Sequence, residues 1–198
     1  MMKMKMWFSM FIVSLMVGLS NASIVKPVAV TGNIAGDAGS SVNWLLDDNG
    51  NQALPGLSDA TGAAITLETG DTLAKALSTY HLRSGIGHEE SWTYGTGAGN
   101  PEFIFDLGTE TTIGSIVLWQ YGNNGGGAGY GGNSTKDFEI IFHTAAEGNV
   151  FDFGSETVEF SGTMDEIYEI TTLDNIAQFF GFDSEVSAQY VGLRIATN

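Results

Sequence analysis

The chain has 198 residues, of which 23 are Asp or Glu and seven are Lys or Arg, so its formal net charge is −16 at pH 7. Nucleic acids and anionic membrane surfaces repel a protein this acidic, which argues against both as partners, and we expect no nucleic-acid partner. The chain contains no cysteine, which excludes a disulfide-held fold and a lipoprotein anchor.

The first 22 residues have the pattern of a secretory signal peptide. Lys3 and Lys5 precede an apolar run from Met6 to Leu19, and Ser20-Asn21-Ala22 supplies small residues for cleavage. The run is shorter than the roughly 20 residues that cross a bilayer, although an uncleaved anchor stays an alternative. We predict a signal peptide over residues 1–22, a secreted or cell-surface location, and no membrane insertion of the mature chain.

Cleavage after Ala22 leaves 176 residues, enough for one domain with its own core, which we predict over residues 23–198. The mature chain keeps five basic residues against 23 acidic ones, a net charge near −18. An exported, acidic, cysteine-free chain fits a bacterial protein better than an animal one.

The first part of this domain predicts one weak strand and one helix. Residues Val42 to Leu46 form the weak strand candidate. Asp71 is a typical helix N-cap, and the following apolar residues fall at helical spacing, so a helix is expected from Thr72 to about Tyr80.

The middle of the chain predicts two buried strands. In Glu102 to Leu107, apolar side chains alternate, and the strand closes at Asp106-Leu107-Gly108. From Ile113 to Tyr121 both faces are largely apolar, which is typical of a central strand buried on both sides. Strict alternation places on one face Ile113, Val117, Trp119 and Tyr121, and on the other Ile116 and Leu118.

Two further stripes of alternating apolar residues lie toward the C-terminus. They are Phe138, Ile140 and Phe142, and Val191, Leu193 and Ile195; weaker candidates are Val158 to Phe160 and Ile167 to Thr171. Short strands separated by Gly, Asn and Asp clusters favour an all-β fold. We predict an antiparallel β-sandwich of the jelly-roll type with one short helix.

The order of several short motifs resembles the discoidin, or coagulation-factor C-type, module. The matching elements are Asn49-Gly50, Trp92, Asp106-Leu107-Gly108, Ile116 to Trp119, Lys136-Asp137-Phe138 and Tyr190 to Ile195. The resemblance implies a galactose-binding-like β-sandwich and a role in surface recognition rather than catalysis.

Two stretches, residues 79–95 and 114–127, are also similar to exported PEP-CTERM-type bacterial proteins, although the sorting tail of that group is absent. Members of the module family usually continue past the YVxL strand into one more strand, which often supplies an acidic calcium ligand. Because this chain ends at Asn198, we expect either a fragment truncated at its C-terminus or a replaced last strand.

The best metal candidate is the segment Asp47-Asp48-Asn49-Gly50-Asn51. Calcium takes six to eight oxygen ligands, and Asp47, Asp48, Asn49 and Asn51 can supply several of them. The resembling family holds calcium in a loop of this region. The alternative is a plain turn between two strands, since the segment does not continue as an EF-hand.

Two loops carry the candidate ligand-binding residues. His88, Glu89 and Tyr94 lie in a polar and aromatic patch of the kind that grips a sugar, and Trp92 beside them is expected in the core. The alternative is that the acids are merely solvated. Asn123, Asn124 and Tyr130 lie in a glycine-rich loop, residues 122–132, that is expected to shape one end of the sandwich.

Catalytic motifs are lacking: the sequence has no Gly-x-Ser-x-Gly, no His-Glu-x-x-His and no cysteine nucleophile. We therefore expect a secreted, non-catalytic module that binds glycans, such as cell-surface or matrix polysaccharide, through loops at one end of the sandwich. Two alternatives remain: an adhesive matrix protein without affinity for sugar, and a fragment of a polysaccharide-processing enzyme.

Overall fold

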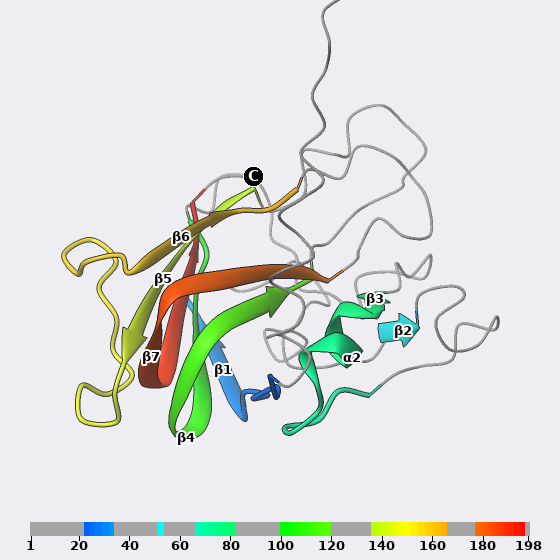
Figure 1. Cartoon of the computed structure of the whole chain (residues 1–198). Helices are drawn as coiled ribbons and strands as arrows, with labels where there is room; N and C mark the ends of the chain where they lie inside the picture. Colours follow the sequence, from blue (N-terminus) through cyan, green and yellow to red (C-terminus); the bar gives the residue numbers. More distant parts are fainter. Residues whose placement is uncertain are drawn as a thin grey trace, which may run out of the picture.

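The computed structural model describes residues 22–33, 51–53, 66–81, 100–119, 136–165 and 177–196. Within these ranges the chain forms mostly β-strands, with one short helix (Figure 1). The elements, in chain order, are β1 (Ala29–Gly32), β2 (Asn51–Ala53), α2 (Leu73–Leu77), β3 (Thr79–His81), β4 (Glu102–Leu118), β5 (Asp137–His143), β6 (Phe160–Thr163) and β7 (Gln178–Ile195).

All strand pairs are antiparallel. Five strands form a sheet in the order β1-β4-β7-β5-β6, and β2 and β3 form a separate pair. The two longest strands, β4 and β7, lie beside each other, so residues far apart in the sequence form the centre of the sheet.

Both long strands bend back on themselves, as Figure 1 shows, and this bend creates two layers. The ladder between β4 and β7 is interrupted between Asp106 and Thr111 and again between Ile113 and Ser115. At the first interruption Gly108 adopts a φ of 80°, and its N–H donates to Asp106 Oδ1 at 2.7 Å. The Asp-Leu-Gly motif therefore bends the strand rather than ending it, because glycine tolerates this backbone conformation.

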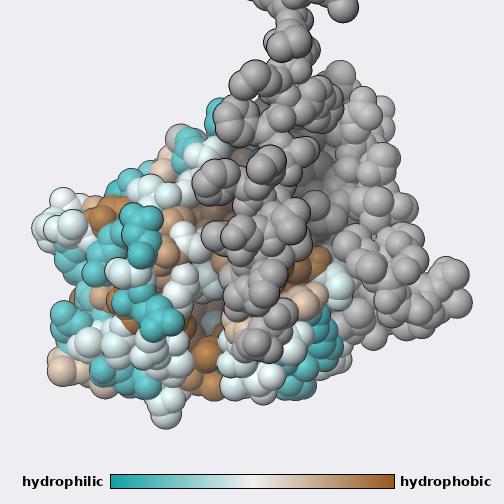
Figure 2. All heavy atoms as spheres, viewed as in Figure 1, coloured by the Kyte–Doolittle hydropathy of each residue, from teal (hydrophilic) through white to brown (hydrophobic). Residues whose placement is uncertain are grey.

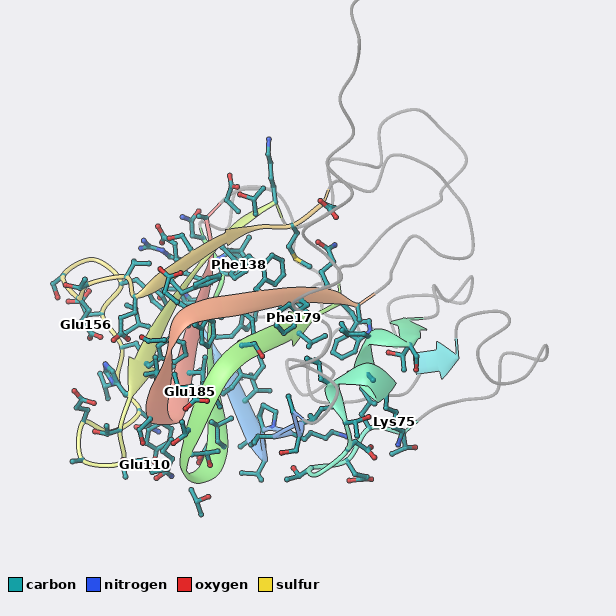
Figure 3. All side chains as sticks on the ribbon, in the orientation of Figure 1. Lys75, Glu110, Phe138, Glu156, Phe179 and Glu185 are labelled. Carbon is teal, nitrogen blue, oxygen red and sulfur yellow. The ribbon has the colours of Figure 1, made fainter. Side chains whose placement is uncertain are left out.

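The hydrophobic core lies between the two layers. Phe138, Ile140 and Phe142 of β5 are almost fully buried, and they face aromatic residues from the first half of β7. Phe180 packs edge-on against Phe138 at 4.8 Å between ring centroids, and Phe182 packs against Phe142 at 5.1 Å. In Figure 3 Phe138 is labelled between the β6 and β7 ribbons. This packing of two antiparallel layers confirms the predicted β-sandwich.

The predicted alternation from Ile113 onward is wrong in one respect. Ile113 and Ile116 both pack against the core, whereas strict alternation places them on opposite faces. At the register shift between Ile113 and Ser115, Gly114 of β4 lies opposite residues 182–185 of β7, so the ladder is irregular there and strict alternation does not continue across it. The segment Ser115 to Trp119 is also half-buried rather than fully buried.

The helix is shorter than predicted and has a different cap. Thr72, not Asp71, is the N-cap, since its side chain accepts from Lys75 N, and α2 ends at Leu77. The hydroxyls of Ser78 and Thr79 then donate to the carbonyls of Lys75 and Ala76. These side chains satisfy the last turn, so the chain can leave the helix and enter β3.

A side-chain hydrogen bond from Trp119 connects α2 and β3 to the sandwich. The indole Nε1 of Trp119, just past the end of β4, donates to Thr79 Oγ1 at 3.1 Å. Thr79 is fully buried, and its hydroxyl donates in turn to Ala76 O. This hydroxyl therefore uses both its donor and an acceptor position, as a buried polar group must.

Candidate functional site

The connection between β5 and β6, residues 144–159, lies against the outer face of the five-stranded sheet. Phe153 of this connection is 6% exposed, and Ile141 of β5 is 3% exposed. In Figure 2 hydrophilic residues gather on the left of the molecule, where Figure 1 places this connection. Two polar networks hold the connection in place.

The first network centres on His143, the last residue of β5. Its Nδ1 lies 3.0 Å from Gly148 O, and its Nε2 lies 2.7 Å from Glu156 Oε2. The ring also stacks on Phe151, with centroids 3.9 Å apart and planes 13° from parallel. The His143 side chain thus contacts the connection at three points: Gly148, Phe151 and Glu156.

The second network centres on Arg194 of β7. Its Nε donates to Glu139 Oε2 at 2.7 Å. Its Nη1 donates to Phe153 O at 3.1 Å. The guanidinium group lies 5.0 Å from the centroid of the Phe153 ring. Arg194 therefore uses its charge, its donors and its flat face to keep Phe153 against the sheet.

Two exposed carboxylates order the turns of the connection. The Ser155 hydroxyl and the Gly154 N–H donate to Asp152 and hold the pKa of its carboxyl below the ordinary value. The backbone N–H and hydroxyl of Thr144 lower the pKa of Glu147 in the same way. In both cases the hydrogen bonds favour the charged form.

Between this connection and the β1 edge of the sheet lies a groove of about 320 Å³, which we call the outer-face groove. Ile104 of β4 contributes to its lining, and Val150 and Phe151 give it an apolar wall. It is lined by Thr31, Gly32, Asn33, Glu102, Ile104, Asn149, Val150, Phe151 and Phe153. Because Gly192 has no side chain, Phe151 can lie directly over β7: a Cβ there would be only 2.6 Å from Phe151 Cδ1.

Two polar side chains of the groove, Asn33 and Glu102, hold each other in position. Asn33 Oδ1 accepts from Glu102 N at 2.9 Å, and Asn33 Nδ2 donates to Glu102 Oε2 at 3.1 Å. The Thr31 hydroxyl and the Asn149 amide add further donors and acceptors at the rim. An apolar wall beside a few oriented polar groups can accept a small polar molecule that has one apolar face.

The predicted ligand-binding residues His88, Glu89, Tyr94, Asn123, Asn124 and Tyr130 lie outside the described residues. The structure therefore does not test whether these residues bind a ligand, and their role stays a prediction. The groove itself was missed by sequence reasoning. The available signal was the segment Phe151-Asp152-Phe153, two aromatic residues in a connection rich in Gly and Asp.

Asp47, Asp48 and Asn49 of the predicted calcium loop also lie outside the described residues, while Asn51 begins β2 and pairs with His81. Within the described ranges no three His, Asp or Glu side chains are grouped so as to hold a metal ion. Calcium binding at residues 47–51 stays a prediction. No helix of the described part is long and apolar enough to cross a membrane.

No protein-family model matches this chain, and no match was found among curated proteins. Several solved structures have a similar arrangement of strands. The lectin domain of Lectinolysin, complexed with Lewis b, is 14% identical, with a TM-score of 0.47 over 88% of this chain and 85% of that one. The family 32 carbohydrate-binding module of Streptococcus pneumoniae EndoD is 14% identical, with a TM-score of 0.42 over 89% and 86%.

A third similar structure is the family 32 module of Clostridium perfringens NanJ in complex with galactose. It is 14% identical, with a TM-score of 0.41 over 84% of this chain and 80% of that one. At such identities the likeness concerns the arrangement of strands alone.

Proposed function

We propose that the protein is a secreted, non-catalytic recognition module that binds carbohydrate, and that the outer-face groove is a binding site. The groove is the observation that carries this proposal. Its apolar wall, Val150 and Phe151, suits the C–H face of a sugar ring, and the Asn33, Glu102 and Asn149 side chains suit its hydroxyls.

The size and stiffness of the groove support the same reading. A volume of about 320 Å³ accommodates one or two sugar rings rather than a protein segment. Asn33 and Glu102 already hold each other, so little side-chain entropy is lost when a ligand binds. The contact is shallow and open to water, so we expect weak affinity at each site.

Affinity electrophoresis through gels containing neutral polysaccharides (a galactan, a mannan and a soluble chitin derivative) tests the proposal. We expect at least one polysaccharide to retard the wild-type protein. The variants Asn33→Ala and Asn149→Ala should lose this retardation, because each removes a polar group from the groove. The exposed residue Glu185 lies where β7 bends (Figure 3), and Glu185→Gln serves as the control that retains binding.

Two outcomes would overturn the proposal. If no gel retards the wild-type protein, the proposal that it binds carbohydrate is wrong. Retardation that survives Asn33→Ala and Asn149→Ala but is lost in Tyr94→Ala would move the site to the loop that contains His88, Glu89 and Tyr94.

A further inference from the structure

The charge of the outer-face groove bears on which sugars it accepts. Glu102 is the carboxylate among the groove-lining residues, and it is half-buried at the start of β4. Its Oε2 accepts from the Asn33 amide, a neutral group, so the negative charge is oriented by that contact but not neutralised by it.

One candidate for a counter-charge is Arg194, which stands opposite Glu102 in the register of β4 and β7. Its guanidinium, however, bonds Glu139, bonds Phe153 O and lies over the Phe153 ring. Arg194 is thus paired with a different carboxylate. Among the described residues no cation is ion-paired with Glu102.

The net negative charge of the whole protein favours the same kind of ligand as Glu102 does, one with a positive charge. With a net charge of −16, the chain repels anionic polymers over a distance of about 10 Å in dilute salt and attracts cationic ones. A uronic-acid polymer would therefore meet repulsion both from the whole surface and from Glu102. A sugar that carries an ammonium group would meet attraction from both.

Building on the proposed function of this groove, we propose that it selects amino sugars whose amine is free and protonated. The ammonium group would donate to the Glu102 carboxylate, while the remaining hydroxyls face Asn33 and Asn149. A charge-assisted hydrogen bond is about twice as strong as one between neutral groups. N-acetylation of the same sugar removes the charge and retains only a neutral amide donor.

The test compares two oligosaccharides of the same backbone and length, one of free glucosamine units and one of N-acetylglucosamine units, by calorimetric titration at about pH 6. At that pH the amine of the free glucosamine units is mostly protonated. We expect the free-amine oligosaccharide to bind about tenfold more tightly in dilute salt. The preference should shrink toward about 0.5 M salt, because salt screens the ion pair. An oligogalacturonate should bind least.

The decisive variant is Glu102→Gln, which keeps an oxygen to accept from Asn33 but removes the charge. It should bind the two oligosaccharides with equal affinity. Glu185→Gln changes the net charge by the same amount away from the groove and should keep the preference.

The proposal and the function it rests on fail in different ways. Equal binding of both oligosaccharides by the wild-type protein, or a preference that persists in Glu102→Gln, would overturn the selection of amino sugars and leave carbohydrate binding intact. No binding of either oligosaccharide, together with no retardation in any polysaccharide gel, would overturn both.

Discussion

The interior between the two layers and the connection on the outer face are both rich in phenylalanine, yet they are held by different forces. Between the layers Phe138 and Phe142 meet Phe180 and Phe182 edge to face, with side chains from both layers around them. On the outer face Phe151 and Phe153 are held by His143 and Arg194. Apolar packing therefore stabilises the first region, whereas hydrogen bonds and charges determine the shape of the second.

This difference predicts that changes in the interior alter stability, whereas changes in the connection alter binding. The largest effect is expected for Phe138→Ala, because Phe138 is 1% exposed and contacts Phe160 and Phe180. We expect a loss of about 3–5 kcal/mol in the free energy of unfolding, measured by urea denaturation. Val150→Ala is the control: Val150 is 79% exposed, and its change should stay within about 0.5 kcal/mol. Equal losses of unfolding free energy in Phe138→Ala and Val150→Ala would refute the proposed difference between the interior and the connection.

Two glycines allow the comparison to be sharpened with the same substitution. A Cβ at Gly162 would collide with the ring of Phe138, and a Cβ at Gly192 would collide with that of Phe151. Gly162→Ala should lower the free energy of unfolding by about 1–3 kcal/mol, because a ring that is fully enclosed has no room to move. Gly192→Ala should be better tolerated and should instead weaken carbohydrate binding, because Phe151 and with it the groove wall are displaced. Urea denaturation and affinity electrophoresis of both variants check these two expectations. A Gly162→Ala protein as stable as the wild type would contradict the first of them.

A smaller effect is expected where α2 and β3 join the sandwich. Trp119→Phe removes the hydrogen bond that the indole N–H donates to the buried Thr79 hydroxyl. This change should lower the free energy of unfolding by about 1 kcal/mol. Adding Thr79→Val removes the partner as well, so the double variant should lose less than the two single losses combined. Strictly additive losses, measured by urea denaturation, would show that this bond does not couple the two segments.

The smallest expected effect is a local response to acid. The pKa values of Asp152 and Glu147 are lowered in the folded protein by hydrogen bonds, so their contribution to stability is present above the ordinary carboxyl pKa, about 4. It is lost as the pH falls through the lowered folded-state values. Below about pH 4 the amide hydrogens of the connection should therefore lose protection relative to their intrinsic exchange rates at that pH, while those of β5 stay protected.

Asp152→Asn with Glu147→Gln serves as the control for this acid response. In this double variant the amide protection of the connection, relative to intrinsic exchange rates, should depend less on pH in that range. Loosening of β5 in the wild-type protein at the same pH as the connection would mean that the two regions do not differ in this way.

The sequence was most informative where burial determines the structure. The stripe Phe138, Ile140 and Phe142 and the stripe beginning at Val191 were predicted from alternation alone, because side chains of a strand in contact with the core recur at every second residue. Alternation could not reveal that β4 bends at Gly108 and shifts register near Gly114, because a bulge leaves no unique residue pattern.

The helix boundary and the outer-face groove show a second limit of sequence reasoning. Thr72 and Asp71 are both good N-caps, and only the fold decides that Asp71 instead bonds Glu68 N and Lys75. The groove joins residues 31–33, 102–104 and 149–153, which become neighbours only through sheet pairing and the folding of the connection over the sheet. Its polar residues follow no local motif.

The central claim is that the outer-face groove binds carbohydrate. It is tested most directly by following the backbone amide resonances of the protein while an oligosaccharide chosen by the affinity gels is added. The account predicts saturable shifts at Gly32, Asn33, Glu102, Ile104, Asn149 and Val150, with little change at β6 or α2. Saturable shifts confined to other parts of the chain, with these six amides unmoved, would contradict it.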